Sequence, residues 1–114
     1  MTAMSDTAEH DTTGWTFANA EAIDWTSMGE GVDMKMLAPA GGRVIAMFQF
    51  APGYAGGTHH HEDAEFSYVL DGDLVSNGVE MASGHAYGVE AGTDHTEFRT
   101  VGGCTLISVF KLPS

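Results

Sequence analysis

From residue 32 onward, short apolar runs alternate with glycine-containing breaks, and no stretch keeps the 3.6-residue period of an amphipathic helix. The dipeptide Asn77-Gly78 is a strong signal for a two-residue hairpin turn, because both positions of a type I′ turn need a positive φ. Asp71-Gly72 and Gly102-Gly103 indicate further reversals. The pattern predicts an all-β fold, an antiparallel barrel or sandwich, with strands at Val32–Leu37, Arg43–Ala51, Thr58–His61, Phe66–Leu70, Asp73–Ser76, Val79–Met81, His85–Val89, His95–Thr100 and Cys104–Lys111.

The 114 residues are enough for one small domain. Residues 1–14 mix threonine, serine, aspartate and alanine and are interpreted as a disordered tail. We expect residues 15–114 to form a single domain, whose first part, from Trp15 to Gly31, is a lead-in that packs its tryptophans against the strands. We find no internal repeat in the sequence.

Two of the predicted strands, Phe66–Leu70 and Cys104–Lys111, are apolar on both faces. A sheet with one face in water normally alternates polar and apolar positions. An apolar outer face therefore needs a cover, which either the lead-in or a second subunit would supply. On this argument we expect a homodimer.

Charge and cysteine content narrow the classes of function. Sixteen acidic residues against four basic ones give a formal net charge of -12, which repels nucleic acids and anionic membranes. The sequence has no apolar run long enough to span a bilayer and no signal-peptide pattern in Met1–Thr13, so we expect a soluble, cytoplasmic protein. The single cysteine, Cys104, excludes an internal disulfide and is expected to be a small core residue.

The segment around three consecutive histidines carries the candidate chemistry. Side chains two apart on a strand share a face, so His59, His61 and Glu65 point the same way and His60 points oppositely. His95, which lies in another glycine-flanked strand, is a fourth candidate. Imidazole and carboxylate groups on one face can hold a divalent metal ion. The alternative is a solvated loop of histidine and acidic residues, because such even spacing also arises by chance.

The spacing of these residues resembles the first sequence motif of the cupin family, here Gly53-x5-His59-x-His61-x3-Glu65-x6-Gly72. The second cupin motif is less complete and would run Gly84-x5-Glu90-x-Gly92-x2-His95-x3-Arg99. Its glycines and its histidine match, whereas Glu90 and Arg99 stand in place of the usual proline and asparagine. The lead-in resembles that of ChrR-like cupins and of small-diketone-cleaving cupins at Trp25, Gly31-Val32, Lys35 and Leu37.

This resemblance implies a jelly-roll β-barrel of the RmlC-like type with one divalent metal ion in its lumen. By the same resemblance, the ligands are His59, His61, Glu65 and His95. Fe(II) is the favoured ion, with Zn, Mn or Ni as alternatives. Some cupins of this broad type use three histidines and keep the glutamate beside the site, which is the alternative for Glu65.

Strand parity suggests further residues of the site. If His95 points inward, then Glu97 and Arg99 on the same face do so as well, while Phe98 points out. Arg99 would bind a substrate carboxylate or enolate, or else form a structural pair with Glu97 or Asp63. Glu97 is a candidate for catalytic proton transfer. Gln49 either faces inward as a substrate-binding residue or is simply exposed.

The leading hypothesis is a non-haem Fe(II) oxygenase that binds a small enolisable carbonyl compound, such as a diketone, and cleaves or oxidises it with dioxygen. One alternative keeps the site for redox-neutral isomerase, lyase or hydrolase chemistry. Another is a non-catalytic zinc-binding module that senses a small ligand, as the resemblance to ChrR suggests. For all three, the expected partner is a small molecule, not nucleic acid or a membrane.

Overall fold

The computed structural model describes residues 10–113 of the chain. In this range the secondary structure is almost entirely β, which confirms the predicted all-β class. A 3-10 turn, η2 (Ala20–Ala22), precedes the strands, which are β1 (Thr26–Gly29), β2 (Val32–Ala40), β3 (Arg43–Phe50), β4 (Ala55–Gly56), β5 (His59–His60), β6 (Glu65–Ser76), β7 (Val79–Ala82), β8 (Ala86–Val89), β9 (Asp94–His95), β10 (Phe98–Arg99) and β11 (Cys104–Lys111).

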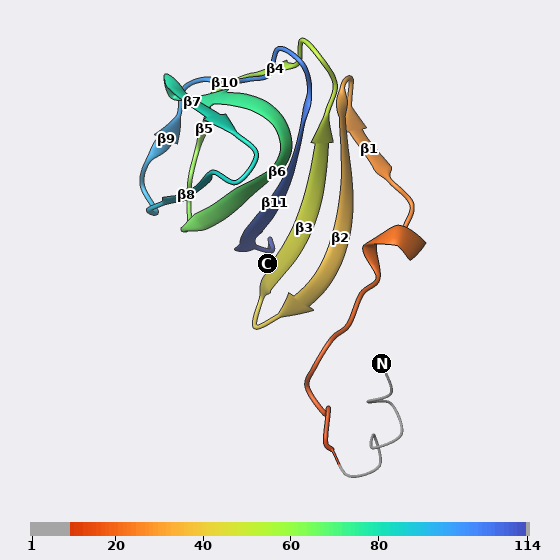
Figure 1. The fold of residues 1–114 in the computed structure, drawn as a ribbon. Helices are drawn as coiled ribbons and strands as arrows, with labels where there is room; N and C mark the ends of the chain where they lie inside the picture. The colour runs from red at the N-terminus through yellow and green to blue at the C-terminus, as the bar shows by residue number, and fades with distance from the viewer. Residues whose placement is uncertain (1–9, 114) are drawn as a thin grey trace.

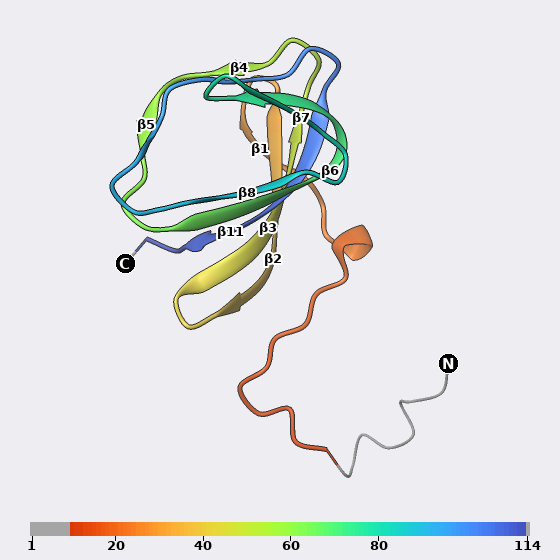
Figure 2. The same ribbon diagram turned by 60° about the vertical axis from the view of Figure 1, so that its left-hand side comes forward.

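The strands form one curled antiparallel sheet and a small second sheet. The main sheet has the order β1-β2-β3-β11-β6-β10-β4, and β7 and β8 also pair with β6. Strands β5 and β9 pair with each other. The long strands β2, β3 and β11 lie side by side in Figure 1, and the short strands β4, β5 and β8 complete a ring with β6 in Figure 2. The architecture is therefore a barrel, with β5 and β9 in the wall opposite the long strands.

Strand β6 differs from the prediction, because Asp71-Gly72 does not reverse the chain. One continuous strand runs from Glu65 to Ser76, and its register with β11 shifts by a bulge at this point. Gly72 has a φ of +92°, and a Cβ atom there would lie 2.0 Å from the carbonyl oxygen of Gly103. Glycine is needed for this close approach, and a bulge bends a strand without ending it. The bend lets β6 pair with β8 along its first half and with β7 and β10 along its second.

The hairpin predicted at Asn77-Gly78 is confirmed. It joins β6 to β7 with Ser76 opposite Val79, and both turn residues have a positive φ, +46° for Asn77 and +80° for Gly78. These are the conformations that a type I′ turn requires. The turn also places the Asn77 side chain beside the segment that follows β9, which matters for the candidate site.

A small apolar core lies between the curled halves of the sheet. Its buried members include Cys104, which confirms that the cysteine is a core residue; the full set is Val69, Leu74, Met81, Cys104 and Leu106. Burial raises the pKa of the Cys104 thiol to about 11, so this thiol stays protonated at neutral pH. Each fully buried valine or leucine contributes roughly 2 kcal/mol to folding.

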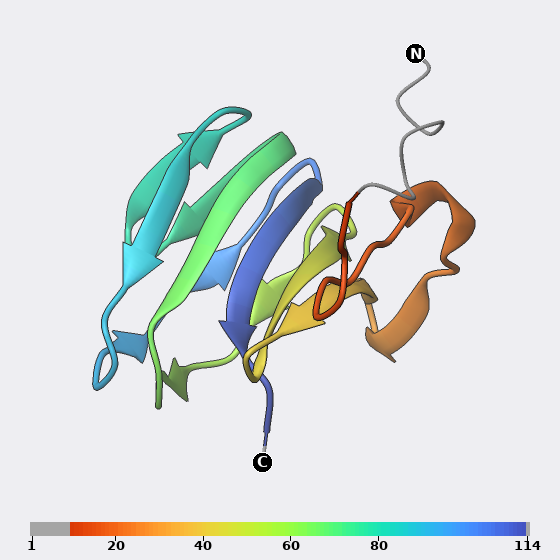
Figure 3. The ribbon, with the colours of Figure 1, turned by 90° about the horizontal axis from the view of Figure 1, so that it is seen from below.

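The described part of the lead-in packs along β2 and not over the apolar outer face of β6. The Thr16 hydroxyl donates to the Pro39 carbonyl at 2.8 Å, and Lys35 lies 4.6 Å from the centre of the Trp25 ring. In Figure 3 this segment lies on the β1–β2 side of the molecule. Of the predicted tail, residues 1–9 lie outside the described residues. In residues 10–113 we find no helix with the length and apolar character needed to cross a membrane.

The apolar outer face of β6 is open in the single chain. Its three alternate side chains are all exposed: Phe66 at 57%, Tyr68 at 44% and Leu70 at 40%. The outward-facing residues of the neighbouring strand, Ile107 and Val109, are partly buried beside them. The lead-in from Trp15 to Gly31 is thus not the cover that this apolar face was expected to have.

Candidate metal centre

Three histidines, one in β5, one directly after β5 and one in β9, converge at one end of the barrel. Antiparallel pairing of β5 with β9 sets His59 directly opposite His95, and their ring centroids are 5.1 Å apart. The His61 ring lies 4.7 Å from His59 and 5.4 Å from His95. One ring nitrogen of each residue falls within 4.8 Å of the others, which makes this group able to hold a metal ion.

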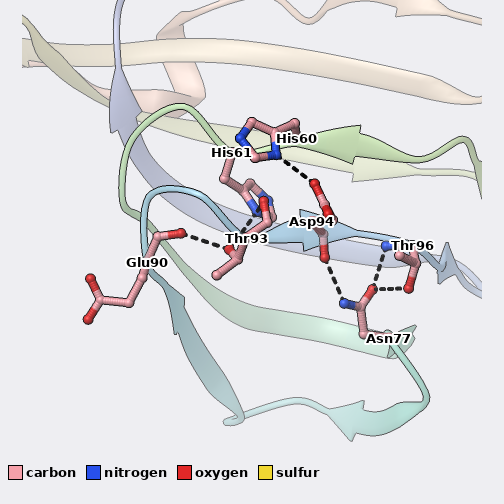
Figure 4. A network of polar contacts seen from close by, with 7 residues as sticks. All are labelled: His60, His61, Asn77, Glu90, Thr93, Asp94 and Thr96. Atoms are coloured by element: carbon pink, nitrogen blue, oxygen red, sulfur yellow. Dashed lines mark hydrogen bonds and ion pairs between the residues drawn. The ribbon is translucent and has the colours of Figure 1, made fainter.

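His61 is held in one tautomer by the loop before β9. Its Nδ1 lies 3.1 Å from both the carbonyl oxygen and the hydroxyl of Thr93, and that hydroxyl donates its own proton to the Glu90 carbonyl at 2.7 Å (Figure 4). With its proton committed to Glu90, the Thr93 hydroxyl can only accept from His61. Nδ1 of His61 therefore carries the hydrogen, and Nε2 is left with the lone pair that a metal needs.

The His95 side chain is buried, as is that of His61. Burial lowers the pKa of its imidazole to about 4, and the neighbouring His59 and His61 rings add to this shift. The ring is consequently neutral at neutral pH and has a lone pair to offer. Its Nε2 lies 2.5 Å from the Ser76 hydroxyl. A metal held by Nδ1 requires Nε2 to carry the proton and to donate it to Ser76.

His60 is excluded from the cluster, as its parity predicts. Its Nδ1 bonds the Asp94 carboxylate at 2.6 Å on the exposed side of β5 (Figure 4). The hydrogen bond to Asp94 raises the pKa of His60, while His60 itself is solvent-exposed. This side chain therefore provides an adjacent histidine outside the cluster for comparison with His59.

Glu65 lies beside the cluster but is not a member of it. Among residues 10–113, the group of converging metal-ligating atoms consists of the three histidines. Glu65 begins β6 and lines, with His59 and His95, a cavity of about 350 Å³ inside the barrel. Of the four residues predicted as ligands, three come together and the carboxylate stands at the cavity wall.

The other predicted site residues do not line this cavity. Glu97 accepts hydrogen bonds from Arg99 Nε at 3.0 Å and from the Gly78 backbone N–H at 2.7 Å, outside the barrel. Arg99 is thus in the structural pair with Glu97 that was the alternative to substrate binding. Gln49 is exposed on β3, and its neighbours Phe48 and Phe50 are the residues that face the lumen.

The inward placement expected for Glu97 and Arg99 was wrong because the strand is interrupted after His95. The Asn77 side-chain oxygen accepts a hydrogen bond from the backbone N–H of Thr96 at 2.7 Å (Figure 4). It accepts a second one from the backbone N–H of Glu97 at 3.1 Å. These two residues separate β9 from β10. The alternation restarts in the opposite phase, so that Phe98, expected outside, lines the cavity.

Sequence reasoning missed three residues around the cluster: Ser76, Tyr87 and Thr93. Tyr87 lines the cavity, and its ring meets His95 edge-on at 6.3 Å. Burial raises the pKa of the Tyr87 phenol, although hydrogen bonding to Ser67 and Ser76 opposes the shift. The sequence signal for Tyr87 was its position in the predicted strand His85–Val89, where alternate residues face the lumen. Nothing local marks Thr93 or Ser76, because their roles depend on residues distant in sequence.

A curled antiparallel barrel with a histidine cluster beside its lumen is the arrangement that the cupin resemblance predicts. The comparison with family models agrees: the ChrR Cupin-like domain matches residues 13–112, and the chain belongs to this family. The resemblance seen in the two sequence motifs is thereby confirmed. A search of curated protein sequences finds no match.

Solved structures share the fold. An RmlC-like cupin from Shewanella frigidimarina is 24% identical with a TM-score of 0.76, over 88% of this chain and 95% of that one. A chain in the Rhodobacter sphaeroides complex of SigE with the anti-sigma ChrR is 23% identical with a TM-score of 0.70, over 82% of this chain and 52% of that one. A candidate acetylacetone dioxygenase from Methylibium petroleiphilum is 16% identical with a TM-score of 0.75, over 83% of this chain and 75% of that one.

Proposed function

We propose that this protein is an Fe(II)-dependent dioxygenase that cleaves a small enolisable carbonyl compound of the 1,3-diketone class. The observation that carries the proposal is a three-histidine cluster, two members of which, His59 and His95, line a cavity of about 350 Å³. A cavity of this size is in the range of small-molecule sites. The shared fold with a candidate acetylacetone dioxygenase supports the same substrate class.

In this proposal His59, His61 and His95 hold the ion, and Thr93 keeps Nε2 of His61 available to it. Bound Fe(II) supplies Lewis-acid polarisation of a chelated dicarbonyl and a redox partner for dioxygen. Glu65 is the one carboxylate among the described residues of the cavity lining, so it is the group placed to take the proton from the carbon between the carbonyls.

The overall reaction balances without a further reductant. The bond between the central carbon and one carbonyl carbon breaks, and each of these two carbons gains one oxygen atom from dioxygen. The products are a carboxylic acid and a 2-oxoaldehyde. The apolar side chains of the cavity would keep bulk water from the deprotonated substrate.

Oxygen uptake by protein reconstituted with Fe(II) under nitrogen tests the proposal. We expect acetylacetone or a related diketone to consume one dioxygen per molecule, with loss of the diketone absorbance. If no diketone in a panel causes oxygen uptake, the proposed dioxygenase activity is rejected. Glu65→Gln should lower kcat and leave the iron content unchanged, whereas Glu62→Gln, an exposed neighbour, should change neither. Loss of iron from Glu65→Gln would instead make Glu65 a ligand.

A second candidate function is redox-neutral chemistry at the same site. Three imidazoles without a carboxylate are also a donor set that zinc uses, with a fourth position open for water or substrate. Metal analysis of protein purified without chelator or added metal separates the candidates, because zinc with oxygen-independent turnover favours this one. Tightly bound zinc and a ligand that is bound but never consumed would favour a sensory module.

We also propose that the open outer face of β6 is a homodimer interface. The groove beside its exposed Phe66 and Tyr68 is lined by Ile107 and Val109, and such exposed apolar patches mark association sites. Sedimentation at micromolar concentration should show a dimer. Tyr68→Asp should give a monomer, and Val101→Asp, an exposed site on another loop, should not. A monomer in the unmodified protein would reject the interface.

A further inference from the structure

Aromatic side chains form one continuous wall of the cavity beside the histidine cluster. Ring centroids are 4.8 Å apart for Phe50 and Phe98, 4.9 Å for Phe50 and Tyr54, and 6.0 Å for Phe48 and Phe110. Phe98 in turn meets His95 at 5.4 Å. We call these five residues the aromatic wall: Phe48, Phe50, Tyr54, Phe98 and Phe110. A wall of this kind favours a ligand with an aromatic body.

A row of three hydroxyl groups also lines the cavity. Ser108 of β11 lies directly opposite Ser67 of β6, and Ser67 lies directly opposite Tyr87 of β8. The two serine hydroxyls are 2.8 Å apart, and all three side chains line the cavity. We call these residues the hydroxyl row. The Tyr87 phenol is a hydrogen-bond donor as well as an acceptor.

Apart from a metal ion on the histidines, the described lining of the cavity offers no positive charge to an anionic ligand. Among the described residues of its lining there is a carboxylate, Glu65, but no lysine or arginine. The four basic residues of the chain are all engaged or exposed elsewhere. Lys35 donates to a backbone carbonyl of the lead-in, and Arg99 pairs with a carboxylate outside the barrel. Lys111 lies 3.9 Å from a partly exposed aspartate, and Arg43 is exposed at the start of β3.

From these three observations we infer that the site selects a neutral aryl diketone carrying one further hydroxyl or carbonyl oxygen. The inference rests on the proposed function for the chelating dicarbonyl and names the rest of the substrate. The aromatic wall packs against the aryl ring, and the hydroxyl row hydrogen-bonds the additional oxygen. A carboxylate on the same ring is rejected, because no cation in the lining compensates for its loss of hydration.

Binding to zinc-loaded protein tests this selection, since zinc does not activate dioxygen. The probes are acetylacetone, 1-phenyl-1,3-butanedione, and the 3-hydroxyphenyl, 4-hydroxyphenyl and 4-carboxyphenyl analogues of the latter, measured by calorimetry. The phenyl compound should bind about tenfold more tightly than acetylacetone. The better hydroxyphenyl isomer should gain about a further fivefold. The carboxyphenyl compound should bind more weakly than the phenyl compound.

Variants test whether the gain in affinity from the hydroxyl group depends on the hydroxyl row and the gain from the phenyl ring on the aromatic wall. Ser67→Ala and Tyr87→Phe should abolish the gain from the hydroxyl group and leave the affinity for the phenyl compound within about twofold. Tyr68→Phe, the adjacent tyrosine on the outer face of β6, is the control and should change neither. Phe98→Leu should reduce the phenyl gain, whereas Phe66→Leu on the outer face should not.

The outcomes separate this inference from the proposed function. Equal binding of all the neutral diketones, or tightest binding of the carboxyphenyl compound, would overturn the selection and leave the dioxygenase proposal standing. Selective binding of aryl diketones by the zinc form, without oxygen uptake by the Fe(II) form, would support the selection and reject the dioxygenase. Binding of no diketone at all would overturn both.

Discussion

Two short segments, His59–His61 and His95–Arg99, carry polar side chains at alternate positions, yet only the first keeps them on one face. The His61 backbone N–H continues the pairing of β5 with a 2.8 Å bond to the Thr93 carbonyl. After His95, the Asn77 side chain takes over as acceptor for two successive N–H groups. Strand alternation therefore holds only where the backbone pairing is unbroken, and one side chain is enough to reset its phase.

The largest contrast should come from neighbouring histidines on opposite faces of β5. His59→Ala removes a member of the ligand cluster and should weaken zinc binding by at least about 1,000-fold, because substitutions of groups that merely support a ligand already cost about 10–100-fold. His60→Ala should change it less than about twofold. Competition with a chelating dye measures both. Equal losses would mean that His60 belongs to the site.

The buried His95 should make the metal-free protein sensitive to acid. Its pKa is lowered from 6.5 to about 4, so below pH 6.5 the unfolded chain binds a proton that the folded chain does not. The free energy of unfolding should fall as the pH decreases from 6.5 to 4, by up to about 3 kcal/mol from this residue. Urea titrations of wild type and His95→Asn at pH 7 and 4.5 isolate that contribution. The same pH slope in both proteins would contradict it.

Removing the interruption after His95 tests the comparison directly. Asn77→Ala loses the acceptor for Thr96 and Glu97 and places alanine at a φ of +46°, which should lower the free energy of unfolding by about 2 kcal/mol. Asn77→Gly keeps the turn conformation and loses only the hydrogen bonds, so its loss should be smaller. Denaturant unfolding measures both variants. An unchanged stability in both would show that Asn77 does not hold this segment.

A smaller effect is expected from the threonine that orients His61. Thr93→Val removes the hydroxyl but keeps the carbonyl acceptor, and should weaken zinc binding about tenfold. Thr96→Val is the matched control, because the Thr96 hydroxyl contacts Asn77 and no ligand. Comparable affinities of the two variants would rule out a role for the Thr93 hydroxyl in orienting the ligand.

The smallest effect is expected at Arg99, which was predicted to face the lumen and does not line the cavity. Arg99→Ala should change diketone affinity less than about twofold, because Arg99 pairs with Glu97 outside the barrel. Calorimetry on zinc-loaded protein checks this value with acetylacetone. A large loss of affinity would mean that Arg99 contacts the ligand and that the strand alternation is not shifted after His95.

The histidine cluster was predictable from sequence because its members obey local rules. His59 and His61 share a face through the two-residue period of a strand, and His95 was found by its place in the second motif. Glu65 lies four residues beyond His61, across a loop between β5 and β6, and parity does not carry through a loop. That is why the carboxylate reached the cavity wall but not the cluster.

The amino-acid sequence by itself determined the all-β class, the Asn77-Gly78 turn and the three histidines, because hydrophobic alternation and turn conformations are local properties. Only the tertiary structure decided that β6 continues through Gly72, that Phe98 faces the lumen in place of Glu97 and Arg99, and that Thr93, Ser76 and Tyr87 surround the ligands. Each of these features depends on a backbone or side-chain group from a segment distant in sequence, which forms a hydrogen bond or packs at that position. Such encounters arise when the sheet curls into a barrel.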